Sequence, residues 1–66
     1  MKLTWKDTQA IGIELADTFP DIDPLTLSFE KLHALICDLP DFEDDPEGSN
    51  EKILEAVLMA WLNERD

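Results

Sequence analysis

Apolar residues recur at helical spacing near the start of the chain. Three of them follow one another at intervals of four residues, which places them on one face of a helix: Ile11, Leu15 and Phe19. Thr4, with Asp7 three residues later, has the pattern of a capping box and predicts that this helix starts near residue 4. Gly12 lies inside the stripe and lowers its intrinsic helix propensity. The pattern predicts an amphipathic first helix that ends before Pro20.

The prolines at positions 20 and 24 end this first helix, because proline lacks an N–H and restricts the residue before it. Asp23 followed by Pro24 predicts a short helical piece, with aspartate as the N-cap and proline at the first helical position. Ser28 predicts the start of a second helix of about ten residues. The apolar face of this second helix consists of Phe29, Leu32, Leu35, Ile36 and Leu39.

Pro40 ends the second helix and opens a segment, up to Gly48, that carries five carboxylates. Phe42 is the candidate anchor of this acidic loop into the core. Ser49 or Asn50 predicts the N-cap of a last helix. The broad apolar face of that helix consists of Ile53, Leu54, Val57, Leu58, Trp61 and Leu62. No alternating strand pattern occurs, so we expect one small all-α domain of three helices over residues 1–66.

The charge of the chain is one-sided. The 66 residues contain 16 Asp and Glu against 5 Lys and Arg, which gives a formal net charge of −11. Thirteen of these acids lie in two stretches without a base, Asp7 to Glu30 and Asp38 to Glu51. Such a field repels nucleic acids and anionic lipids, so plausible partners are a basic protein surface, a metal ion or both. A solvated face that serves solubility is the alternative interpretation.

Cysteine content and hydropathy indicate the cellular compartment in which the protein is expected. Cys37 is the single cysteine, so an internal disulfide is impossible. Neither the apolar run of a signal peptide nor that of a membrane span occurs, and we expect a cytoplasmic protein without membrane attachment. A hydrophobic content of 44% predicts a folded chain. Trp5 and Trp61 are expected in its core, with their indole N–H groups hydrogen-bonded.

The acidic loop invites comparison with a calcium-binding EF-hand. Its acids stand at alternate positions, as calcium ligands do: Asp41, Glu43 and Asp45. However, Pro46 occupies the place of the glycine that makes the sharp turn, and Lys52 the place of the bidentate glutamate. The sequence therefore argues against an EF-hand.

Other metal-ligating patterns are weaker still. Glu47, Glu51 and Glu55 are spaced by four residues and would share one face if the last helix starts early. Such an open site would suit iron(II), manganese, magnesium or calcium better than zinc or copper. His33 and Cys37 could reach one metal together, but the neighbouring acids raise rather than lower the pKa of a thiol, and a small buried cysteine is the favoured interpretation. No nucleophile paired with a base is present, so we expect no enzymatic activity.

Several short blocks along the chain recur together in one known family. They are Trp5 with Asp7, Pro20-Asp21, Asp23-Pro24, Phe29, Ile36-Cys37-Asp38-Leu39, Phe42, Asp44-Asp45-Pro46, the run from Ser49 to Ala56, and Trp61-Leu62. Through these blocks the chain, from Leu3 to Asn63, resembles the IscX family of small acidic accessory proteins of bacterial iron-sulfur cluster assembly. The resemblance implies a modified winged-helix-like fold without nucleic-acid function. It also implies an adaptor that binds a basic surface of the enzyme cysteine desulfurase.

The resemblance also implies which residues bind iron and the partner, and which other proteins share the docking area. It implies weak iron(II) binding without a tightly bound cofactor, and a docking area shared with bacterial frataxin and ferredoxin. The matching acids predicted as iron ligands are Asp7, Asp21, Asp23, Asp44, Asp45, Glu51 and Glu55. The partner-binding surface is predicted to consist of Asp38, Asp41, Glu43, Asp44, Asp45, Glu47, Glu51 and Glu55. Family members often carry a glutamate in place of Ile13 and a neutral residue in place of Glu14, and a carboxylate shifted by one residue turns about 100° around a helix.

Two functions therefore stay open. The first is a monomeric, non-catalytic adaptor or regulator of cluster assembly, with iron(II) binding secondary. The second is a ferrous iron carrier whose contact with the desulfurase serves only delivery. DNA binding through a winged-helix scaffold is disfavoured, because a recognition helix needs basic side chains to meet phosphates.

Overall fold

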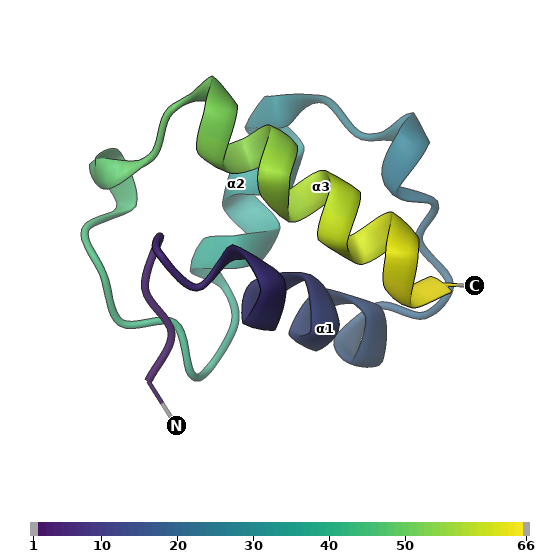
Figure 1. The fold of residues 1–66 in the computed structure, drawn as a ribbon, viewed down its shortest axis with the longest axis horizontal. Helices are drawn as coiled ribbons and strands as arrows, with labels where there is room; N and C mark the ends of the chain where they lie inside the picture. The colour runs from purple at the N-terminus through teal and green to yellow at the C-terminus, as the bar shows by residue number, and fades with distance from the viewer. Residues whose placement is uncertain (1, 66) are drawn as a thin grey trace.

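Three helices form the protein, as the sequence predicts. The structure is a computed structural model that describes residues 2–65. Its α-helices are α1 (Thr8–Thr18), α2 (Phe29–Cys37) and α3 (Glu51–Arg65), and two short 3₁₀-helices lie between them, η1 (Pro24–Thr26) and η2 (Pro46–Gly48). α3 packs against both other α-helices (Figure 1). Within residues 2–65 the β pairing consists of one parallel bridge, between Leu3 and Phe42. The finer likeness to a winged helix stays a prediction.

Local capping explains where α2 and α3 begin. The Ser28 hydroxyl accepts a hydrogen bond from the Lys31 backbone N–H at 3.2 Å, which confirms the predicted cap of α2. Of the two residues predicted to cap the last helix, Asn50 does so, because its Oδ1 accepts from the Ile53 N–H at 3.0 Å. Each of these side chains satisfies one backbone donor that the first turn of a helix leaves without a partner.

The first helix begins at Thr8, so the prediction that it starts near residue 4 is wrong. The capping pair does form, since the Asp7 carboxylate accepts from the N–H and the hydroxyl of Thr4 at 3.1 and 3.2 Å. It closes a turn ahead of the helix instead of opening the helix. The physical reason is a long-range contact. The backbone N–H of Trp5 donates to Asp44, far along the chain, and the Trp5 side chain is buried in the core, so residues 4–7 form a turn instead of the first turn of α1.

The apolar stripes of the three helices meet in one core. Its buried members are Leu3, Trp5, Ile11, Leu15, Leu32, Ile36, Leu39, Leu54, Val57, Ala60 and Trp61. Burying a valine, leucine or isoleucine side chain contributes about 1.5–3 kcal/mol. Phe29 departs from the prediction and stays 37% exposed at the start of α2. The expected hydrogen bond of the Trp61 indole is also wrong: its Nε1 is buried and has no partner within residues 2–65, because apolar side chains surround it.

Gly12 marks a close approach of α1 to α3. A Cβ atom added at Gly12 would lie 2.5 Å from the Cβ of Ala60, 2.8 Å from the backbone N of Trp61 and 2.9 Å from the carbonyl carbon of Ala60. Favourable contacts between carbon atoms lie at about 3.5–4.0 Å. The glycine that weakens the helical propensity of α1 is therefore required by the packing of α1 against α3.

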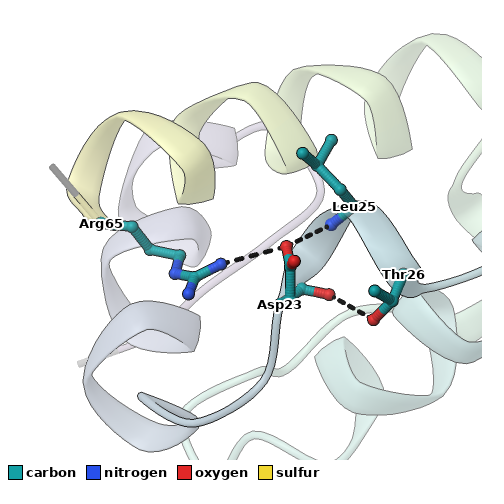
Figure 2. A network of polar contacts seen from close by, with 4 residues as sticks. All are labelled: Asp23, Leu25, Thr26 and Arg65. Atoms are coloured by element: carbon teal, nitrogen blue, oxygen red, sulfur yellow. Dashed lines mark hydrogen bonds and ion pairs between the residues drawn. The ribbon is translucent and has the colours of Figure 1, made fainter.

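The corner between α1 and α2 is tied to the C-terminal end of α3 (Figure 2). Asp23 Oδ1 accepts from the Leu25 N–H at 3.0 Å, which confirms the predicted cap of η1, and it also accepts from Arg65 Nη1 at 3.1 Å. The Thr26 hydroxyl donates to the Asp23 carbonyl at 2.7 Å. Such an exposed ion pair contributes about 0–1 kcal/mol, so its main effect is to fix the position of the corner.

Candidate functional site

The acidic loop, residues 41–48, lies along one edge of the molecule beside the N-terminal segment (Figure 1). The two segments pair through Leu3, whose N–H donates to the Asp41 carbonyl at 2.8 Å and whose carbonyl accepts from the Glu43 N–H at 2.9 Å. Phe42 is half-buried, and its ring meets that of Trp5 edge-on, with the centroids 4.7 Å apart. The prediction that Phe42 anchors the loop in the core is confirmed.

Trp5 holds the central part of the acidic loop. Its backbone N–H donates to Asp44 Oδ2 at 3.0 Å, and its indole Nε1 donates to the Asp45 carbonyl at 2.6 Å. At the end of the loop, a Cβ added at Gly48 would lie 3.0 Å from Trp5 Cδ1, so the loop backbone lies directly on the indole. Trp5 itself is only 3% exposed, which confirms its predicted place in the core.

The two central acids of the loop bind the loop's own backbone. Asp44 Oδ1 accepts from the Asp45 N–H at 2.7 Å, while Oδ2 accepts from Trp5. Asp45 Oδ1 accepts from the Glu47 N–H at 3.0 Å and thereby caps η2. Asp44 and Asp45 are therefore charged acceptors that shape the loop.

His33 and Cys37 reach the same region from α2. The His33 ring stacks on the Trp5 indole, with centroids 5.6 Å apart and planes 17° apart, and its Nε2 donates to the Pro46 carbonyl. The Cys37 sulfur lies 4.0 Å from both ring nitrogens. Burial, together with the charge of Asp38, raises the pKa of the Cys37 thiol, so the thiol stays protonated at neutral pH. This agrees with the sequence argument against a reactive cysteine.

Other carboxylates of the predicted partner-binding surface point into solvent. Those with exposed side chains, besides Asp44 and Asp45, are Asp38, Glu43, Glu47, Glu51 and Glu55, and Asp41 is half-buried. Glu51 and Glu55 share one face of α3, being four residues apart. Glu47 does not join them, because Asn50 starts α3 at Glu51 and leaves Glu47 in η2. The predicted row of three glutamates along one helix face is therefore reduced to two.

Basic side chains are closer to this surface than the sequence suggests. Lys2 and Lys6 precede the first acid-rich stretch in the chain, yet their charges reach Asp44 and contribute to lowering the pKa of its carboxyl. They do so because the N-terminal segment pairs with the acidic loop. The negative field is accordingly weakened at Asp44.

The acids predicted as iron ligands are spread over the molecule. Asp7 precedes α1, Asp21 follows it, Asp23 pairs with Arg65, and the others belong to the acidic loop or to α3. In the part of the chain that the structure describes, no three side chains of His, Cys, Asp or Glu lie close enough to hold one metal ion. Iron(II) binding by this set stays a prediction.

Asp44 gives the acidic loop a pH dependence of defined sign. Hydrogen bonds from the Trp5 and Asp45 N–H groups hold the pKa of its carboxyl below the ordinary value of 3.8. A lowered pKa in the folded state means that the stabilisation is complete above the ordinary value and is lost as pH falls through the lower one. We expect acid to loosen the loop in this range, detected as loss of the Trp5 indole N–H signal and faster amide exchange in residues 43–48.

Two matched variants test whether protonation of Asp44 causes the loosening of the loop in acid. Asp44→Asn carries no titratable group at this position and should lack the acid step, whereas Asp17→Asn, an exposed change on α1, should keep it. An unchanged acid step in Asp44→Asn would show that another group controls the loop.

Helix hydropathy bears on membrane insertion, and comparison with known proteins places the chain in a family. No helix within residues 2–65 is long and apolar enough to cross a bilayer. The sequence model of a family described as "Iron-sulphur cluster assembly" matches residues 3–66, which include the acidic loop and all three α-helices. An uncharacterized protein of Pseudomonas aeruginosa is 44% identical over 66 residues, and the match covers the whole of both chains. The chain belongs to the iron-sulphur cluster assembly family, the IscX family, and its role lies in the assembly of these clusters.

Proposed function

We propose that this protein is a non-catalytic adaptor that docks its acidic surface on a basic patch of cysteine desulfurase and modulates sulfur delivery to cluster assembly. The observation that supports the proposal most is the acidic loop, whose backbone is held by Leu3 and Trp5 while its glutamates face solvent. A fixed array of exposed carboxylates is suited to a complementary basic surface. Bacterial frataxin and ferredoxin, if they bind the same patch, would compete with it.

The carboxylates that would meet the partner are those not used inside the loop. Glu43 and Glu47 of the acidic loop, together with Glu51 and Glu55 of α3, have exposed side chains that make no hydrogen bond or ion pair within residues 2–65. Asp44 and Asp45 would contribute charge but act mainly by shaping the loop.

Weak iron(II) binding is a secondary part of the proposal. Carboxylate oxygen is a suitable ligand for iron(II), and Glu51 with Glu55 offers two carboxylates one helical turn apart. Two ligands leave most of the coordination sphere to water, so an ion held there would exchange readily.

Titration of cysteine desulfurase with this protein at two salt concentrations, with and without iron(II), tests the proposal. We expect the iron-free protein to bind at low salt and to lose much of its affinity toward about 1 M salt, where the Debye length falls from about 10 Å to about 3 Å. Absence of binding at low salt would refute docking. Binding that appears only with iron(II) would favour the iron carrier instead.

A further inference from the structure

The contacts of Trp5 connect the protein core to the proposed docking surface. We infer that Trp5 and His33 form a latch that fixes the acidic loop in its binding conformation, which makes both of them positioning residues for recognition of a basic protein surface. This inference rests on the proposed docking function. The latch consists of the Trp5 indole, which donates to the Asp45 carbonyl, and the His33 ring, which donates to the Pro46 carbonyl; the backbone N–H of Trp5 adds a hydrogen bond to Asp44.

The acidic loop has little apolar surface with which to hold itself in place. Every residue from Glu43 to Gly48 is exposed, and Phe42 at the start of the loop is half-buried. Its attachment from Glu43 onward therefore depends on polar contacts with buried or half-buried neighbours. Trp5 supplies two of these contacts, one from its backbone N–H and one from its indole, while its own side chain is fixed in the core.

His33 adds a second attachment point from a different helix. Its Nε2 donates to the Pro46 carbonyl in η2, and its ring lies on the Trp5 indole. The N-terminal segment thus holds the loop through Trp5, and α2 holds it at Pro46 through His33. Gly48 ends the loop beside Trp5, because the absence of a side chain there lets the backbone lie against the Trp5 ring.

A fixed loop matters for binding because ordering a flexible one on association lowers affinity. The latch provides that order before the partner arrives. It carries no carboxylate on either of its two side chains, so breaking it leaves the acidic charge of the surface unchanged. Loss of the latch should therefore weaken binding equally at all salt concentrations, whereas loss of a docking carboxylate should also reduce the salt dependence.

Two variants break the latch in different ways. Trp5→Phe keeps an aromatic ring in the core and removes the indole donor to the Asp45 carbonyl. Gly48→Ala places a Cβ about 3.0 Å from Trp5 Cδ1, so the loop must shift by a few tenths of an ångström against the fixed indole, without the replacement of any core residue. In both, we expect amide exchange of residues 43–48 in the free protein to rise about tenfold or more, while exchange in the middle of α3 is unchanged. We expect the affinity for cysteine desulfurase to fall about fivefold to tenfold with the same dependence on salt.

The control is Glu47→Gln, which should reduce the salt dependence of binding without speeding amide exchange elsewhere in the loop. Unchanged exchange in both latch variants would overturn the latch itself. Faster exchange with unchanged affinity would overturn its role in recognition. If the wild-type protein does not bind the desulfurase, the proposed function and the recognition role fail together, and the exchange measurement alone still decides whether the latch fixes the loop.

Discussion

Replacing Gly12 by alanine is expected to remove a large part of the stability of this protein. The added Cβ would lie 2.5–2.9 Å from atoms of Ala60 and Trp61, and two of those three atoms belong to the backbone of α3. No change of side-chain rotamer can relieve such a contact, so α1 and α3 must move apart. Overpacking of this kind costs about 1–3 kcal/mol and occasionally more. A small domain of this size has a net stability of about 3–5 kcal/mol.

The sign of this effect separates packing from helix propensity. Propensity alone would make Gly12→Ala stabilising by about 1 kcal/mol. Urea unfolding followed by circular dichroism measures the difference, and Gln9→Ala on the exposed face of α1 is the control, with an expected change of at most about 0.5 kcal/mol. The double variant Gly12→Ala with Ala60→Gly should recover only part of the loss, because the contact with the Trp61 backbone remains. A Gly12→Ala protein as stable as the wild type would mean that the two helices do not approach this closely.

Neutralising three exposed glutamates should have the largest effect on binding. The triple variant Glu47→Gln, Glu51→Gln and Glu55→Gln removes charges at the end of the acidic loop and on the adjoining face of α3. Exposed charge pairs contribute roughly 0.2–1 kcal/mol each, so we expect the affinity for cysteine desulfurase at low salt to fall about tenfold. The dependence of affinity on salt should become weaker as well, because fewer charges are paired at the contact.

A control with the same net charge shows whether position matters. Asp17→Asn, Asp21→Asn and Glu64→Gln also remove three charges, all from exposed positions. Asp17 lies near the C-terminal end of α1, Asp21 follows that helix, and Glu64 lies near the C-terminal end of α3. These two helix ends lie on the side of the molecule opposite the acidic loop (Figure 1). Binding measured by calorimetry over a salt series should be close to that of the wild type. If this control loses as much affinity as the first variant, overall charge rather than the proposed face controls docking.

Most of the fold follows from short-range signals in the sequence. The apolar spacing around Ile11 and Leu15, and the caps at Ser28 and Asp23, act over a few residues, and the structure confirms each of them. A cap satisfies a backbone donor within three residues of itself, so its effect depends little on the rest of the molecule. The same holds for the prolines that end the helices.

The prediction for the start of the first helix is wrong because of partners distant in the chain. The pair Thr4 and Asp7 forms but does not open a helix, because Trp5 is committed to Asp44 and Asp45, 39 and 40 residues away. The sequence predicts Trp5 in the core and offers His33 only as a weak candidate metal ligand beside Cys37. It carried no signal that the two hold the acidic loop, since nothing in a local pattern specifies which donor meets which distant carbonyl.

The amino-acid sequence alone is enough to establish the three helices, the excess negative charge and the resemblance to a family of cluster-assembly proteins. Periodicity, capping chemistry and residue counts are local or summed properties, and they do not require knowledge of which segments touch. Three further features are visible only in the folded structure: Gly12 is a contact point between α1 and α3, Asp44 and Asp45 shape their own loop, and Lys2 and Lys6 lie near Asp44. These features arise where α1 packs on α3 and where the N-terminal segment pairs with the acidic loop, so they depend on contacts that exist only in the folded chain.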